Sequence, residues 1–120
     1  MTRFGFSPLL FTDVETAKDL VSILPNEVGV LCDLAHLNVS SHVLRFNKSD
    51  VINLISERTY GIHLSHNDRS EDTNRVIIEH TWYKKYVSTL EKSEFITLET
   101  YDYSKHSIMQ QYEKLQEFIS

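Results

Sequence analysis

The sequence contains few of the residues that crosslink, interrupt or anchor a chain. It has one cysteine, so no disulfide can form within it, and only two prolines and three glycines, so no Pro- or Gly-rich linker divides it. We find no apolar run long enough to cross a membrane and no apolar leader. We therefore expect a cytoplasmic protein without membrane contact, folded as a single domain over residues 1–120.

The sequence also has fewer basic than acidic residues. Lys and Arg number 12 against 17 Asp and Glu, which gives a net charge of -5, and the basic residues stand singly or in pairs. Binding to a nucleic-acid backbone needs a basic stripe or patch. We therefore expect no nucleic-acid partner. The sequence also lacks GxGxxG, Walker, CxxC and nucleophile-elbow motifs, so it does not indicate a nucleotide cofactor or a covalent serine mechanism.

Apolar periodicity predicts alternating helices and strands. A capping box at Thr12 to Glu15 predicts the first helix, Ser49 can cap a second, and helical spacing recurs at 82–90 and 108–119. Apolar segments at 28–33, 59–64 and 95–99 predict strands, and the first is typical of a strand covered on both faces. The predicted fold is α/β, with three parallel strands and four helices.

Each predicted strand has, at its last position or next to it, a side chain that can bind a metal ion: Asp33, His63 and Glu99. They are separated by about the 30 residues of a βαβ unit. Because the carboxyl ends of parallel strands meet at one edge of a sheet, these groups can converge on a single ion. Taken singly, Asp33 is more typical of a helix cap or a loop brace and His63 of a core histidine, whereas a buried Glu99 needs a partner.

Further polar residues follow the first two strands. His36 lies three residues after Asp33, and the segment from His63 to Arg69 is rich in polar groups. The rigid fork of donors on Arg69 suits an anionic or hydroxyl-rich ligand, and the alternative is a surface arginine paired with a nearby aspartate. His66 and Asp68 are weaker candidates in the same segment.

The segments CDLAH, GIHLSHNDR and ITLE, in this order and spacing, resemble the ends of strands six, seven and eight of the xylose-isomerase-like TIM barrels. This superfamily contains sugar and sugar phosphate isomerases and epimerases and the endonuclease IV group. The resemblance spans roughly the whole chain. It implies that Asp33, His63 and Glu99 bind a divalent ion such as Mn, Co, Mg or Zn, with Glu99 also an acid/base catalyst. It implies that His36 and Arg69 contact substrate oxygens.

The sequence departs from this family in extent. A complete (β/α)8 barrel takes about 250 residues, whereas this chain supplies three strands, and the family's metal-binding glutamate at the end of strand five has no counterpart. The resemblance thus implies the C-terminal part of a sugar or sugar phosphate isomerase or epimerase, inactive alone. Self-association or a complementary barrel half would complete it, because three strands cannot close a barrel.

Two other functions are compatible with the same residues. One is a catalytically silent partial barrel that acts by binding a partner. The other is an endonuclease-IV-like metal phosphodiesterase, which is disfavoured by the negative net charge and because Asp72-Thr73-Asn74 stands where that group has an aspartate-x-histidine pair.

Overall fold

The computed structural model describes residues 13–78, 81–87, 93–102 and 104–119. This part of the chain has an α/β fold with one three-stranded parallel sheet and five α-helices. In chain order the elements are α1 (Val14–Ile23), β1 (Val30–Asp33), α2 (Leu34–Val43), α3 (Lys48–Ile55), a 3-10 turn (Ser56–Arg58), β2 (Thr59–Leu64), α4 (Lys84–Val87), β3 (Phe95–Leu98) and α5 (Lys105–Ile119). Within these described ranges no helix combines the length and the apolar character needed to cross a membrane.

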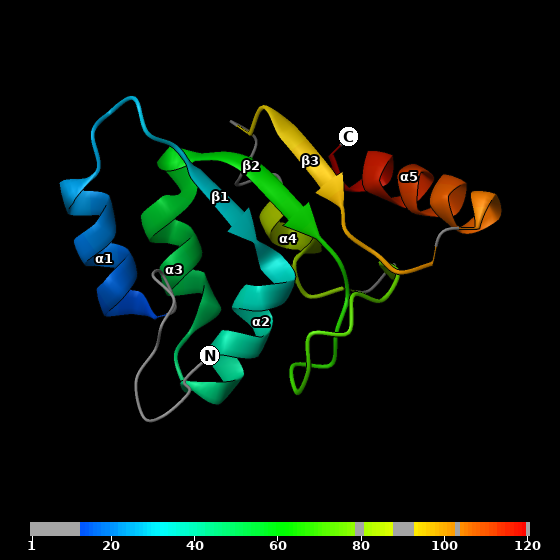
Figure 1. The fold of residues 1–120 in the computed structure, drawn as a ribbon, viewed down its shortest axis with the longest axis horizontal. Coiled ribbons are helices and arrows are strands. Elements are labelled where there is room, and N and C mark those ends of the chain that lie inside the picture. The colour runs from blue at the N-terminus through cyan, green and yellow to red at the C-terminus, as the bar shows by residue number, and fades with distance from the viewer. Residues whose placement is uncertain (1–12, 79–80, 88–92, 103, 120) are drawn as a thin grey trace.

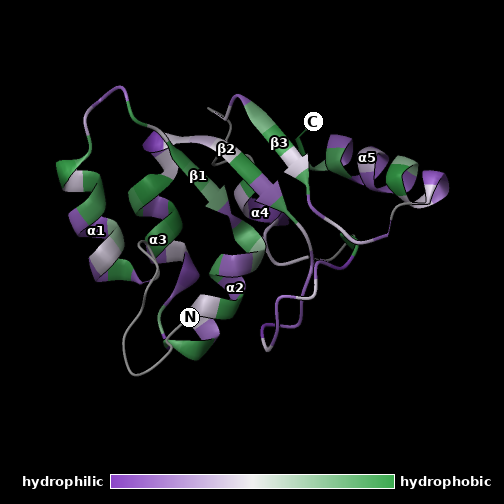
Figure 2. Cartoon of the chain, viewed as in Figure 1, coloured by the Kyte–Doolittle hydropathy of each residue, from purple (hydrophilic) through white to green (hydrophobic). Residues whose placement is uncertain are grey.

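The three strands run in the same direction, as the sequence predicted, with β2 between β1 and β3 (Figure 1). In register, Asp33 lies opposite His63, and His63 lies opposite Thr97. All carboxyl ends of the strands therefore meet at one edge of the sheet. The polar loop that follows β2 lies at this edge, where Figure 2 shows it as mostly hydrophilic.

Among the described residues, helices cover one face of the sheet and leave the other open. Cys32, Ile62 and Leu64 are buried and belong to the hydrophobic core, together with apolar residues of α1, α3, α4 and α5. On the other face Leu31 and Phe95 are each 51% exposed. The prediction that residues 28–33 are covered on both faces is therefore wrong, because the helices of the described residues pack against only one of them.

The single cysteine belongs to this core. Cys32 is 4% exposed, and its burial, together with the charge of Asp33, raises the pKa of its thiol to about 12. The thiol stays protonated at neutral pH and cannot act as a thiolate nucleophile. Its role is that of a small buried side chain.

Helix α2 is the element that the sequence analysis missed. Its buried residues include Leu34, Leu37, Asn38 and Ser41, so polar and apolar side chains are buried alike and leave no clear apolar stripe to recognise. The helix ends with the amide of Phe46 donating to the carbonyl of Ser41 at 3.1 Å. Arg45 between them has a left-handed φ of 56°, the conformation typical of a Schellman motif.

Two predicted helix starts were misplaced by a residue or two. Helix α1 is capped by Asp13, whose carboxylate accepts from the amide of Thr16 at 2.7 Å, and Thr12 lies outside the described residues. Helix α3 is capped by Asn47, which accepts from the amide of Ser49 at 2.9 Å. Ser49 is therefore not the cap. Asp and Asn rank at least as high as Ser and Thr at this position, so the sequence offered adjacent candidates of similar strength.

The last two predicted helices are borne out to different extents. α5 spans Lys105–Ile119 and contains the whole predicted segment 108–119. The predicted helix at 82–90 is described as α4, Lys84–Val87: residues 82 and 83 form a turn before it, and residues 88–92 lie outside the described part of the chain. Its aromatic residues serve the core: the rings of Trp82 and Tyr83 meet edge to face at 5.6 Å.

Candidate metal centre

Asp33, His63 and Glu99 come together at the carboxyl edge of the sheet. One ligand atom from each lies within 4.8 Å of the other two. His63 Nδ1 is 3.2 Å from Glu99 Oε2 and 3.8 Å from Asp33 Oδ2, so one imidazole nitrogen faces both carboxylates. Parallel pairing produces this convergence, because it places the ends of three segments that are distant in sequence side by side.

The two oxygens of Asp33 have separate roles. Oδ1 accepts from the amide of His36 at 2.9 Å and so caps helix α2. Oδ2 faces His63 and also lies 3.1 Å from Nδ1 of His36. Asp33 is therefore both the helix cap and a member of the cluster, which are the two roles that the sequence left open.

His36 holds Asp33 from the solvent side. Its Nδ1 contacts Asp33 Oδ2, and its Nε2 contacts Asp72 Oδ2 at 2.5 Å. The hydrogen bond to Asp33, reinforced by the charges of both carboxylates, raises the pKa of His36 to about 9 against the opposing effect of burial. Burial by itself raises the pKa of Asp33, but the hydrogen bonds and charge of His36, with a smaller contribution from His63, lower it overall.

His36 is therefore an imidazolium at neutral pH, and both of its nitrogens are engaged by carboxylates. In this arrangement it orients Asp33 and partly neutralises it. Contact with substrate oxygens, the role implied by the family resemblance, would require His36 to leave Asp72.

Glu99 is fixed through its backbone, while its side chain stays accessible. Its amide donates to the carbonyl of Leu64 at 2.9 Å, and its own carbonyl accepts from Nδ2 of Asn74 at 2.9 Å. The side chain is 44% exposed. Asn74 has a left-handed φ of 46°, which asparagine tolerates better than most residues. The carboxylate of Glu99 is therefore the most accessible of the cluster, and hydrogen bonds fix the backbone that carries it.

The loop after β2 joins both neighbouring strand ends. Its stem is an antiparallel bridge between His66 and Arg75. Toward β1, Nδ2 of the buried Asn67 donates to the carbonyl of Ala35 at 3.0 Å; toward β3, Asn74 holds Glu99. Residues 65–75 therefore form a loop that connects the strand ends at this edge of the sheet.

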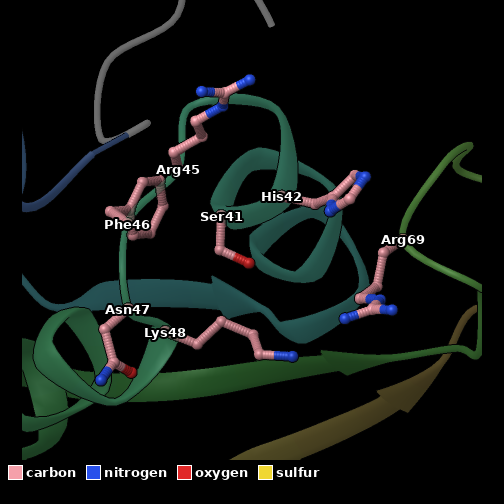
Figure 3. Close-up of a pocket in the computed structure, with 7 residues that line it drawn as sticks. All are labelled: Ser41, His42, Arg45, Phe46, Asn47, Lys48 and Arg69. Carbon is pink, nitrogen blue, oxygen red and sulfur yellow. The ribbon is translucent and has the colours of Figure 1, made fainter.

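Arg69 lies in this loop but borders a different hollow. It lines a pocket with residues of α2 and the start of α3, and none of Asp33, His63 or Glu99 lines that pocket (Figure 3). Within the described residues Arg69 forms no ion pair with Asp68 or Asp72, the alternative that the sequence left open. His66 and Asp68 do not belong to the cluster of potential ligands either.

The three clustered groups are chemically suited to a divalent ion. Imidazole nitrogen and carboxylate oxygen bind Zn²⁺ and similar ions at about 2.0 to 2.2 Å, so two ligand atoms on one ion can be at most roughly 4.4 Å apart. Both distances from His63 fall below that limit, and the ligand atoms of the two carboxylates lie within 4.8 Å of each other. The contact from His36 to Asp33 and the hydrogen bond from Asn74 to Glu99 supply the surrounding interactions that orient metal ligands.

Sequence reasoning missed Asp72 and Asn74 as supports of this site. Both lie in a loop whose path depends on the bridge at its stem, so spacing alone could not reveal them. The only available signal was the density of polar residues after β2. Comparison with models of known protein families, with curated proteins and with solved structures yields no match to this chain.

Proposed function

We propose that Asp33, His63 and Glu99 bind a divalent metal ion and that this centre, once the missing part of the barrel completes it, acts on a sugar or sugar phosphate by proton transfer next to a carbonyl. The observation that carries the proposal is the convergence of three ligand atoms, from three strand ends, within 4.8 Å. The family resemblance of the same residues supports the choice of an isomerase or epimerase reaction. The fold proposed with it is the C-terminal part of a TIM barrel, of which the described sheet would be strands six to eight.

An ion in this place would polarise a carbonyl or hydroxyl oxygen of the sugar and stabilise negative charge there. Glu99 is the residue best placed to move a proton, because its side chain is partly exposed while its backbone is held on both sides. The imidazolium of His36 keeps the carboxylate of Asp33 turned toward His63. The roles are thus divided: His63 and Asp33 bind the ion, His36 positions Asp33, and Glu99 both binds the ion and exchanges the proton.

The reaction can be probed with a planar mimic of the enediolate. In the presence of Co²⁺ we expect threonohydroxamate to bind at least tenfold more tightly than threitol, because an active site is complementary to the charge that develops during the reaction. The visible absorption of protein-bound Co²⁺ gives the affinity of both compounds.

The His63→Ala variant provides the control for hydroxamate bound to free Co²⁺. Equal affinity of the Co²⁺-saturated wild-type protein for threonohydroxamate and for threitol would argue against this chemistry.

A second candidate function is assembly through the open face and edges of the sheet. Leu31 and Phe95 are exposed apolar residues on that face, and among the described strands β1 and β3 each pair on one side only. Unpaired strand edges beside apolar surface favour association. We propose a second copy of this chain as the partner, because the free edge of β1 is complementary to that of β3 in a continued parallel sheet.

This assembly predicts a mass that rises with concentration. Sedimentation of the wild-type chain is expected to show a dimer or larger species, and Leu31→Glu is expected to shift it toward the monomer by placing a charge at the contact. The matched control is Met109→Glu, which changes an exposed residue of α5 away from the sheet. A monomeric wild-type protein at all concentrations would rule this partner out.

A further inference from the structure

The pocket that includes Arg69 is rich in positive charge. It lies between the second half of α2, the start of α3 and the loop after β2, and it is lined by Ser41, His42, Arg45, Phe46, Asn47, Lys48 and Arg69 (Figure 3). Three of these residues are cationic and none is acidic. In a chain of net charge -5, such a local excess of positive charge needs a specific explanation.

The side-chain amides of Asn38 and Asn67 form a buried pair that holds the Lys48 side chain and the Arg69 backbone. Asn38 and Asn67 are 1% and 4% exposed, and Nδ2 of Asn38 donates to Oδ1 of Asn67 at 2.7 Å. Oδ1 of Asn38 accepts from Nζ of Lys48 at 2.7 Å, and Oδ1 of Asn67 accepts from the amide of Arg69 at 3.1 Å. The same pair therefore anchors the Lys48 side chain and the Arg69 backbone, and in Figure 3 the two cationic groups extend toward each other.

Within the described residues neither Lys48 nor Arg69 forms an ion pair with an aspartate or glutamate. Burial first, and then the charges of Arg69 and Lys85, lower the pKa of Lys48. Nζ of Lys48 also lies 4.0 Å from the centre of the Trp82 ring, which keeps the ammonium group in place. Lys48 and Arg69 are held near each other against their mutual repulsion.

The backbone of Arg69 carries a cost as well. Its φ of 80° lies in the left-handed region, which is unfavourable for a long side chain and is retained where the surroundings require it. The hydrogen bond from the Arg69 amide to Asn67 accompanies this conformation. Arg69 therefore combines a strained backbone with a guanidinium that has no acidic partner among the described residues.

We propose that this pocket binds a phosphate group, with Lys48 and Arg69 contacting it from opposite sides. A doubly charged anion neutralises both cations, and the guanidinium fork matches phosphate oxygens in a bidentate geometry. Lys48 supplies a point charge fixed against Trp82. The group can be free inorganic phosphate or the phosphate of a small phosphomonoester, and the site is separate from the metal centre.

The test uses the tryptophan in contact with Lys48. The chain has one Trp, so its fluorescence reports directly on ligands that bind beside Lys48. The whole chain is titrated without metal, at constant ionic strength, with inorganic phosphate, with glycerol 2-phosphate and with chloride. We expect saturable binding of the phosphates and no saturation with chloride. Tighter binding of the ester would identify a phosphorylated small molecule as the ligand, and equal or weaker binding would identify free phosphate.

Two substitutions test the two sides of the pocket. Lys48→Met keeps an apolar stem on the Trp82 ring but removes the charge, and Arg69→Gly removes the guanidinium while relieving the left-handed strain. Each is expected to weaken phosphate binding at least tenfold, and Lys105→Met in α5 is the control that leaves it unchanged. Far-UV circular dichroism verifies that the variants fold.

Wild-type affinity in both pocket variants, or no saturable phosphate binding by the wild-type protein, overturns the proposal. The result is independent of the metal centre, because His63→Ala is expected to bind phosphate normally.

Discussion

Replacing His63 with alanine is expected to lower the affinity of this chain for Mn²⁺ or Co²⁺ by roughly 100-fold. Substitutions that only disturb the support of a metal ligand already cost about 10- to 100-fold, and here the central ligand itself is removed. His63 Nδ1 is the atom that both carboxylates face, at 3.2 and 3.8 Å. Without it, two carboxylates remain with no nitrogen donor between them. Isothermal titration calorimetry on the wild-type and variant proteins measures the effect.

The carboxylates need variants that leave the fold intact. Asp33→Ala would also remove the cap of α2, which costs about 0.5 to 2 kcal/mol of stability. Asp33→Ser is better, because serine caps a helix well yet brings no carboxylate. Glu99→Gln changes charge without changing size. Both are expected to weaken metal binding by roughly tenfold or more. Asp68→Ala, in the loop after β2 and outside the cluster, is expected to leave metal binding unchanged.

Unaltered metal affinity in all three variants, His63→Ala, Asp33→Ser and Glu99→Gln, would show that any ion binds elsewhere. The proposed function would then lose its support. The proposed phosphate pocket would keep its support, because its cationic residues belong to other elements of the fold.

Truncating Ile62 to alanine is expected to destabilise the protein by about 2 to 5 kcal/mol. Ile62 is fully buried in β2, the central strand of the sheet. The substitution removes three buried carbons and leaves a cavity that rigid strands on both sides cannot close. A domain of this size has a stability of about 5 to 15 kcal/mol, so the loss is a large fraction of the total.

Urea unfolding followed by circular dichroism measures this loss as a lower midpoint at an unchanged slope. The matched control is Ile23→Ala, the same change of side chain at an exposed position near the end of α1, where we expect an effect within about 0.5 kcal/mol. A midpoint for Ile62→Ala equal to that of the wild-type protein would contradict the packing described for β2.

Much of the framework followed from local patterns in the sequence. The strand at Thr59–Leu64 was predicted with its observed limits, and within it Ile62 and Leu64 are buried while His63 is partly exposed, because successive side chains alternate between faces. The parallel arrangement followed from strands alternating with helical segments. The convergence of Asp33, His63 and Glu99 was predicted from their shared position at strand ends.

Helix α2 shows where local pattern fails. Periodicity reveals a helix only when one side is polar, and α2 buries asparagine and serine as well as leucine because its polar side chains find partners inside the protein. The partner of Asn38 lies on a loop about thirty residues away. The Asn38–Asn67 amide pair, which brings Lys48 and Arg69 to one pocket, could not be predicted for the same reason, because its two residues are distant in the sequence.

By itself, the sequence determined the order of the strands and of four of the helices, the parallel sheet and the three metal-competent residues at or next to the strand ends, because these depend on side-chain periodicity and on which residues stand where each strand ends. Only the tertiary structure decided which groups support them. In the folded chain His36 lies between two carboxylates, Asn74 donates a hydrogen bond to the backbone carbonyl of Glu99, and Arg69 lines a separate pocket. The physical reason is that hydrogen bonds and charge contacts act over a few ångströms, whatever the separation along the chain.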